Sequence, residues 1–159
     1  MVDRKLFILG VLIFISFVLN TIGVFTPCWF VSSSGATGGI VPYNKLAELW
    51  FLAATVAMYF SFVLFSFMLF IYLYTFSLVH RYGYSRSVRK WFKLMTNSSG
   101  MIVMFTILAL ILFGVNLSKT SGSSETYWLG YSAWLCCAAA AISLGIFVLV
   151  VIIIEKECK

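Results

Sequence analysis

The residues of this chain that could carry acid–base, nucleophilic or metal chemistry are few and far apart. Histidine occurs once, as His80, and the carboxylates lie near the termini or in predicted loops, as Asp3, Glu48, Glu125, Glu155 and Glu157. No group of them has the spacing of a metal site, and no nucleophile has a base within its own segment. Cys136 and Cys137 are adjacent, whereas thiol–disulfide enzymes use a Cys-x-x-Cys pair. The sequence therefore predicts no enzyme, no metal site and no cofactor.

Four long apolar stretches, each free of Lys, Arg, Asp, Glu and His, account for most of the chain. They are Leu6–Thr26, Leu49–Val79, Gly100–Leu117 and Tyr127–Ile154. At ~1.5 Å per helical residue, each is long enough, or nearly so, to cross a bilayer core of ~30 Å. The composition is 62% hydrophobic and 10% charged, whereas a soluble domain has about 25% charged residues. We therefore expect an all-α membrane protein, with a single four-span domain over residues 1–159 embedded in the lipid bilayer.

The distribution of Lys and Arg predicts how these spans are oriented. With both termini in the cytoplasm, the basic residues inside are Arg4, Lys5, Arg81, Arg86, Arg89, Lys90, Lys93, Lys156 and Lys159, and those outside are Lys45 and Lys119. Cytoplasmic segments carry an excess of basic residues, so we expect both termini in the cytoplasm and no nucleic-acid partner. We also expect the protein to lie in the plasma membrane. An alternative for the first stretch is a cleaved signal peptide. However, it is longer than a usual signal core, and Thr26-Pro27-Cys28-Trp29 has no small-x-small cleavage pattern.

The predicted cytoplasmic loop Val79–Ser99 interleaves basic and aromatic residues. Its basic residues are Arg81, Arg86, Arg89, Lys90 and Lys93. Such a segment can lie on a leaflet of anionic lipids, with ~1 kcal/mol of attraction per basic residue, or it can serve only to fix the orientation of the spans. Cys158, next to the last span, is either a palmitoylation site or an unmodified thiol.

Small and polar residues indicate which helix faces pack together. On the first stretch, Asn20 shares a face with Ser16 and Gly23, which suits close helix contact and an interhelical hydrogen bond. A place in a permeation pathway is the alternative for Asn20. On the fourth stretch, small residues recur at intervals of four, with Ser132, Cys136 and Ala140 in the adjoining row. The predicted packing residues are Asn20, Gly23, Ala133, Cys137, Ala141 and Gly145.

The loop between the first two spans, Pro27–Glu48, is predicted to lie outside the cell. Segments around Trp29–Ser32 and Gly39–Val41 could pair as a small β-hairpin. The predicted extracellular contact residues are Trp29, Gly39, Ile40, Pro42 and Tyr43. Cys28 has no second cysteine on this side, so no disulfide within the chain is expected there. Asn116-Leu117-Ser118 matches the glycosylation sequon, but it lies so near the membrane that modification is not expected.

Several short motifs, taken in order, resemble a known family. They are Thr26-Pro27-Cys28-Trp29, Gly39-Ile40-Val41-Pro42-Tyr43-Asn44, Gly83-Tyr84-Ser85-Arg86-Ser87-Val88-Arg89, Gly130-Tyr131-Ser132-Ala133-Trp134-Leu135 and the tail Lys156-Glu157-Cys158. Their order across four spans resembles the claudin and peripheral myelin protein superfamily, and most of all its Clc-like, nematode-type branch. The resemblance implies a left-handed four-helix bundle with a small extracellular β element in the first loop.

The departures from typical claudins bear on function. Ile40 and Val41 stand where claudins have Leu and Trp, the paired loop cysteines are missing, and the loop retains only Lys45 and Glu48 as charged residues. A paracellular pore is therefore disfavoured. We expect a non-enzymatic protein that acts in membrane assembly, in cell–cell contact at a junction, or as an auxiliary subunit of a channel or receptor. Its partners would be copies of itself, other membrane proteins and anionic lipids. The alternatives are an oligomeric pore or transporter, and a membrane-organising protein of the four-span vesicle type.

Overall fold

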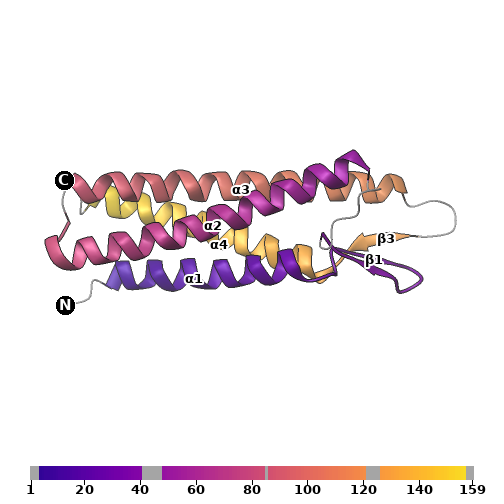
Figure 1. Ribbon diagram of the computed structural model, residues 1–159, viewed down its shortest axis with the longest axis horizontal. Helices are drawn as coiled ribbons and strands as arrows, with labels where there is room; N and C mark the ends of the chain where they lie inside the picture. Colours follow the sequence, from indigo (N-terminus) through magenta and orange to yellow (C-terminus); the bar gives the residue numbers. More distant parts are fainter. Residues whose placement is uncertain (1–3, 41–47, 85, 121–125, 157–159) are drawn as a thin grey trace.

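The computed structural model describes residues 4–40, 48–84, 86–120 and 126–156. These residues form the helices α1 (Arg4–Phe25), α2 (Leu49–Tyr82), α3 (Arg86–Thr120) and α4 (Tyr131–Lys156). Each of the four is long and apolar enough to cross a membrane, which confirms the predicted fold class. The helices lie side by side along one long axis, with the start of α1, the α2–α3 turn and the end of α4 together (Figure 1). We call this the basic end and the opposite end, where the strands lie, the sheet end.

The third helix begins well before the predicted span. The chain turns at Gly83, which has a φ of 68°, and α3 then starts at Arg86 rather than at Gly100. The expected loop over Val79–Ser99 is therefore wrong, because most of that segment is helical. The polar residues of this segment interrupt the apolar pattern, so the sequence placed the start of the span after them. However, no Pro or Gly lies between Arg86 and Gly100 to stop a helix. This extension is amphipathic, and Phe92 is fully buried on its inner side.

The buried residues of each helix recur at alternating intervals of three and four. The series is Leu6, Leu9, Ile13, Ser16, Asn20 and Gly23 in α1, and Ser132, Cys136, Ala139, Ser143, Ile146, Val150 and Ile153 in α4. The same intervals lead from Ala54 to Thr75 in α2 and from Val88 to Phe113 in α3. A mean interval of about 3.5 is shorter than the ~3.6 residues of a helical turn, so the helices wind around one another with a left-handed twist. We call these series the seams.

Hydroxyl groups on the seams join the helices through hydrogen bonds. The Oγ of Ser16 donates to the carbonyl of Ala139 at 2.8 Å, which joins α1 to α4. The Oγ of Ser99 donates to the carbonyl of Ser143 at 2.6 Å, which joins α3 to α4. Within hydrocarbon no water can take the place of either partner. Interhelical bonds of this kind contribute ~0.6 kcal/mol each on average, so they select the alignment of the helices more than they stabilise the bundle.

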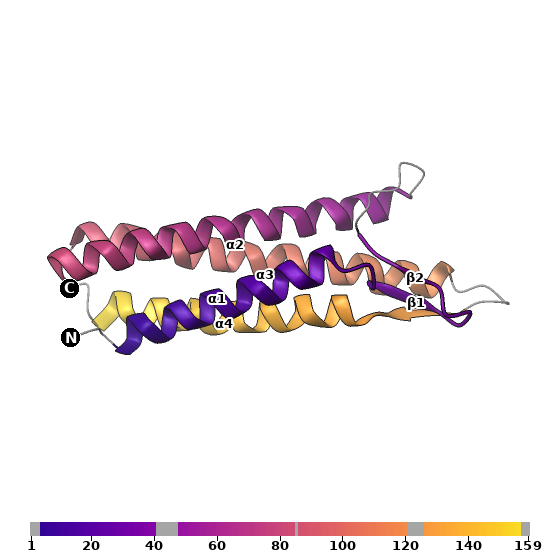
Figure 2. The ribbon, with the colours of Figure 1, turned by 60° about the horizontal axis from the view of Figure 1, so that its bottom comes forward.

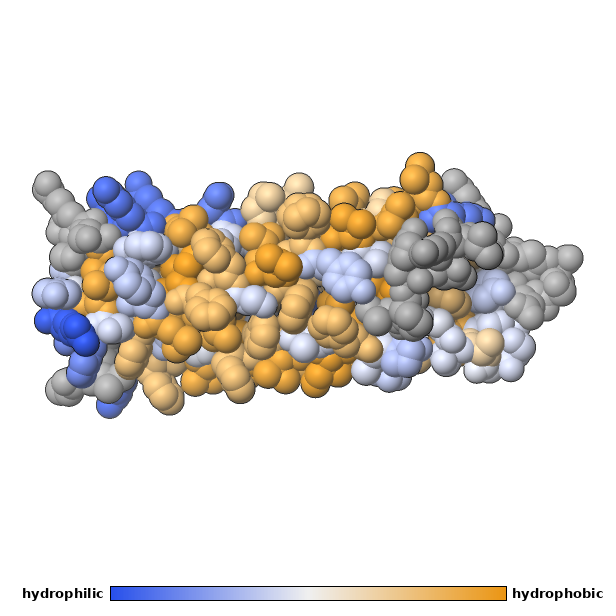
Figure 3. Space-filling model, in the orientation of Figure 1, coloured by the Kyte–Doolittle hydropathy of each residue, from blue (hydrophilic) through white to orange (hydrophobic). Residues whose placement is uncertain are grey.

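The outward surface of the bundle is apolar along most of its length. Large exposed side chains cover it, among them Phe14, Phe70, Met104 and Ile111. In the space-filling view the middle of the molecule is mostly hydrophobic, and hydrophilic residues gather at the basic end (Figure 3). Soluble monomers rarely expose contiguous apolar patches of more than a few hundred Å². This surface therefore belongs in hydrocarbon, as expected of a multi-pass membrane protein.

Three short strands within the described residues form an antiparallel sheet. The central strand β1 (Phe30–Ser32) pairs with β2 (Thr37–Gly38) on one side and with β3 (Tyr127–Leu129) on the other. The sheet lies beyond the helices α1 and α4 at the sheet end (Figure 2). The expected β element is confirmed, but its second strand is Thr37–Gly38 rather than Gly39–Val41. A third strand, β3, comes from the start of the predicted fourth span. Its residues are apolar and lead directly into α4, so a hydrophobicity pattern could not separate the strand from the span.

Candidate functional site

Trp29 holds the sheet against the bundle. Its side chain is fully buried, and its indole N–H donates to the carbonyl of Gly23 near the end of α1 at 2.8 Å. Its backbone N–H donates to the carbonyl of Gly38, and its own carbonyl accepts from the N–H of Gly130, both at 2.8 Å. One residue thus connects the end of α1, strand β2 and the residue that precedes α4.

The Trp29 ring packs on an aromatic cluster centred on Phe113 of α3. The Phe113 ring centroid lies 5.0 Å from that of Trp29, 5.6 Å from that of Trp50 and 5.7 Å from that of Phe51. Aromatic pairs of this kind contribute ~0.5–1.5 kcal/mol beyond the area that they bury. The cluster therefore couples the first loop to both α2 and α3. Phe113 was missed from the sequence, although its place on the α3 seam could have indicated it.

Two glycines allow the backbone segments at this end to approach closely. A Cβ on Gly130 would lie 2.1 Å from the carbonyl oxygen of Cys28, and a Cβ on Gly39 would lie 2.5 Å from Cα of Pro27. Neither glycine can be replaced without movement of the backbone opposite. The N–H of Ser132 also donates to the Cys28 carbonyl, at 3.1 Å. These contacts fix the loop without a disulfide, and Cys28 is a buried free thiol.

Three aromatic side chains near the junction of β3 and α4 face outward. The exposed fractions are 51% for Trp128, 55% for Tyr131 and 65% for Trp134. Tyr131 and Trp134 lie on the first turn of α4, where rings at a membrane–water boundary are expected. Trp128 lies on the strand, beyond the helix. Together with the exposed residues 33–36 that join β1 and β2, and with Thr37 of β2, it forms an uncharged surface that we call the outer patch.

The predicted extracellular contact residues do not form this patch. Trp29 and Ile40 are fully buried, and Gly39 packs against Pro27. The prediction that these three contact a partner is therefore corrected: they hold the sheet in place. The other two, Pro42 and Tyr43, lie outside the described residues. A tryptophan two residues after a proline at the end of a span is as suited to anchoring the loop as to contacting a partner, and the sequence gives no signal that separates the two roles.

The predicted packing residues of α1 lie in the core. Asn20 and Gly23 are both buried, and a Cβ on Gly23 would meet Sγ of Cys136 at 2.5 Å and the carbonyl oxygen of Ser132 at 2.9 Å. The backbones of α1 and α4 are therefore in direct contact here. Within the described residues the Asn20 amide has no hydrogen-bond partner. The interhelical hydrogen bond expected from this face is made by Ser16 instead.

The predicted packing row of α4 turns away from the core. Ala133 is buried, Cys137 is half-buried, and Ala141 and Gly145 are exposed, with no atom within 4 Å of a Cβ built on Gly145. Residues four apart on a helix of ~3.6 residues per turn are offset by ~40°, so three such steps rotate the row by ~120°. The prediction is wrong for Ala141 and Gly145. The α4 seam, which alternates intervals of three and four, is the face that packs.

The predicted basic residues lie on helices and not on a loop. The exposed ones are Arg81, in the last turn of α2, and Arg89, Lys90 and Lys93, in the first turns of α3. Arg86 is the first residue of α3, and Cys158 lies outside the described residues. The charges therefore form a collar around the basic end, at the height where the helices would leave a bilayer core.

The described residues offer surfaces for contact more than groups for chemistry. No three described His, Cys, Asp or Glu residues come close enough together to hold a metal ion. The buried polar residues in the described part of the chain are all Ser, Thr or Asn. Two surfaces remain that could take part in binding, namely the outer patch and the basic end.

Comparison with known proteins agrees with this architecture. The chain has the arrangement of a four-span membrane protein with a small sheet over one end of its bundle. A family model described as "Tight junction protein, Claudin-like" matches residues 1–159, and the search of curated proteins found no match. The chain belongs to the claudin-like tight junction protein family. Membership supports a non-enzymatic membrane protein of the junction type, while the nematode-type branch stays a prediction.

Proposed function

We propose that this protein forms contacts between neighbouring cells, with the sheet end outside the cell and the outer patch as the surface that meets a second copy. The observation that carries the proposal is the exposure of Trp128 on β3, a strand whose three residues all pair with β1. A tryptophan that is 51% exposed on a fixed support is a typical anchor of protein–protein contacts. We further propose that the basic end and both termini lie in the cytoplasm, because basic residues are retained there.

The rigidity of the sheet favours contact. Ordering a flexible loop on binding costs about 0.5–1.5 kcal/mol for each immobilised side chain. Here Trp29 and Gly130 already fix the strands through backbone and indole hydrogen bonds. The described residues of the outer patch carry no charge, so two identical patches can approach each other without repulsion between like charges.

A test uses two populations of cells, one that expresses the protein and one that does not. The protein should accumulate where two expressing cells meet and stay uniform where only one cell expresses it. Trp128→Ser should reduce this accumulation severalfold with normal delivery to the surface. Tyr82→Ser is the matched control, because Tyr82 is 73% exposed at the basic end. Accumulation of Trp128→Ser at the unchanged level would contradict the proposal.

The alternative of an oligomeric pore makes a different prediction. The buried side chains of the described bundle include no charged residue, so an ion pathway would have to lie between copies. Liposomes that contain only this protein should show no more ion flux than empty liposomes if contact is its function. Robust flux would favour the pore. For an auxiliary subunit, purification in mild detergent should instead recover one channel or receptor in fixed proportion to this chain.

A further inference from the structure

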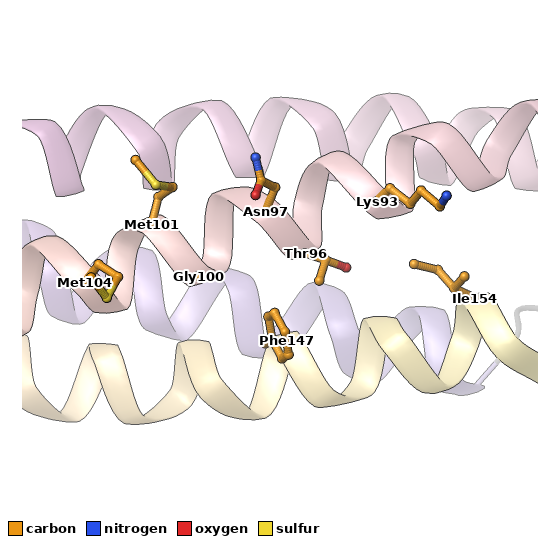
Figure 4. Close-up of a pocket in the computed structure, with 8 residues that line it drawn as sticks. All are labelled: Lys93, Thr96, Asn97, Gly100, Met101, Met104, Phe147 and Ile154. Carbon is orange, nitrogen blue, oxygen red and sulfur yellow. The ribbon is translucent and has the colours of Figure 1, made fainter.

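A groove runs along the outside of the bundle between α3 and α4, near the basic end. Its volume is about 350 Å³, which is within the range of ligand sites. The residues that matter here are Lys93, Asn97, Gly100 and Met104 of α3 with Phe147 and Ile154 of α4. Figure 4 shows Lys93 and Ile154 toward one end of the groove and Met104 toward the other, with the Phe147 ring between the two helices.

Gly100, which has no side chain, lines the middle of the groove. No atom lies within 4 Å of a Cβ built on Gly100, so the space beside it is open. Behind the groove, the hydrogen bond from Ser99 to the carbonyl of Ser143 holds α3 against α4. The two helices are therefore joined at the core and separated at their outer edges, and the separation is a fixed part of the fold.

Polarity changes along the groove in one direction. On α3 the lining residues Lys93, Asn97, Gly100 and Met104 are spaced by four, three and four, so they lie on one face of the helix. Met104 follows Lys93 by eleven positions, which correspond to ~16 Å at ~1.5 Å per residue. That length is about half of a bilayer core of ~30 Å. The groove thus begins with a charge at the membrane surface and ends with apolar residues near the bilayer centre, which is the order of groups in a phospholipid.

The charge at the polar end is available to a ligand. Lys93 is exposed, and within the described residues it forms no ion pair. Arg89 and Lys90 lie one turn nearer the basic end and are also exposed. An anionic headgroup placed here would meet positive charge, with charge-assisted hydrogen bonds from the Lys93 ammonium. A zwitterionic headgroup would gain less, because its own cation would face these residues.

We propose that this groove binds one anionic glycerophospholipid from the leaflet at the basic end. The Lys93 ammonium holds its phosphate. One acyl chain lies over Gly100 and along Met104, against the ring of Phe147. The site is independent of the contact function proposed for the sheet end, since no residue is shared between the two.

Native mass spectrometry of the full chain in mild detergent tests the site directly. Phosphatidylserine and phosphatidylcholine with identical acyl chains are the probes. The chain should retain one phosphatidylserine, and more of it than of phosphatidylcholine. Lys93→Gln should lower phosphatidylserine retention about fivefold, the factor that corresponds to ~1 kcal/mol for one basic residue near a membrane surface. Gly100→Leu fills the groove and should lower the retention of both lipids.

Two controls separate the groove from the general surface. Gly114→Leu places the same side chain on an exposed position of α3 outside the groove, and Arg81→Gln removes an equal charge at the same end but on α2. Both should retain phosphatidylserine at nearly the unaltered level. Equal retention of the two lipids, or equal losses in Arg81→Gln and Lys93→Gln, would overturn the proposal. If Gly100→Leu does not fold, the exposed Lys93→Gln still decides it.

Discussion

Two glycines on apolar helices, Gly23 and Gly100, have opposite surroundings. A Cβ on Gly23 would lie 2.5 Å from Cys136 and 2.9 Å from the backbone of Ser132, whereas a Cβ on Gly100 would have no neighbour within 4 Å. The first glycine brings α1 and α4 into direct contact near the sheet end. The second leaves the space between the outer edges of α3 and α4 open near the basic end. The same residue type thus closes the bundle in one place and opens it in another.

The difference shows that a small residue in a span does not by itself predict contact with another helix. What decides its role is whether it lies on the seam, where residues recur at alternating intervals of three and four. Gly23 is on the α1 seam, while Gly100 follows Ser99, a seam residue of α3, and so faces outward. Each prediction below alters one side of this comparison.

Gly23→Leu should have the largest effect. Inserting bulk into a packed core costs ~1–3 kcal/mol when side chains can adjust, and here the obstacle includes the backbone of α4. We expect loss of the folded bundle, measured as loss of a cooperative thermal transition in detergent. Gly100→Leu should keep that transition, because the new side chain enters open space. A stable Gly23→Leu variant would show that α1 and α4 are not in contact at this point.

Trp29→Ala should have the second-largest effect on stability. Truncation of a buried tryptophan typically costs ~3–5 kcal/mol, and the carbonyl of Gly23 would also lose its indole donor. The thermal midpoint should fall sharply, and protease should cut the first loop. Trp29→Phe keeps the contact with Phe113 but loses the hydrogen bond. Its thermal midpoint should therefore lie between those of the unaltered chain and of Trp29→Ala. If Trp29→Ala and Trp29→Phe prove equal, the aromatic cluster contributes little.

Ser16→Ala should have a smaller effect on the α1–α4 contact. It removes the hydrogen bond to the carbonyl of Ala139 at a cost of ~0.6 kcal/mol, the average for interhelical bonds in membranes. Denaturant titration in mixed micelles can resolve this difference. Thr21→Ala is a suitable control, since among the described residues the Thr21 hydroxyl bonds only to the carbonyl of Phe17 in its own helix. A larger loss in Thr21→Ala would argue against the joining role of Ser16.

Ala141→Leu should have the least effect. Ala141 faces outward, and surface substitutions of this kind usually stay within about 0.5 kcal/mol. The thermal midpoint of this variant should match that of the unaltered chain. Ala139→Leu, on the buried seam of the same helix, is the contrasting change and should destabilise strongly. Similar behaviour of the two variants would place the α4 seam elsewhere.

The sequence predicted the general architecture because four stretches long enough to span a bilayer carry no charged residue, and such stretches are typical of membrane-spanning helices. It failed at α3 because the polar residues Thr96–Ser99 interrupt the apolar pattern, whereas the helix also includes Val88 and Phe92, which are buried on its inner side. It failed at β3 because Tyr127–Leu129 is as apolar as the span that follows. Both errors are errors of boundary rather than of class.

The candidate site was harder to predict. Trp29 and Trp128 are the same residue type, and only the three-dimensional arrangement shows that one is fully buried and the other half exposed. The small residues at intervals of four on α4 predicted a packing face. Each interval of four turns ~40° around the helix axis, so the later residues of the row face away from the core. The groove beside Gly100 depends on the spacing between two helices, which no local pattern encodes.

The most direct test of the account is the side of the membrane on which each end lies. Ser34→Cys, on the exposed tip of the outer patch, and Tyr82→Cys, at the basic end, can each be treated with a membrane-impermeant maleimide in intact cells, with the unaltered chain as background. The account predicts labelling of Ser34→Cys in intact cells and of Tyr82→Cys only after permeabilisation. Labelling of Tyr82→Cys in intact cells, or protection of Ser34→Cys, would contradict it.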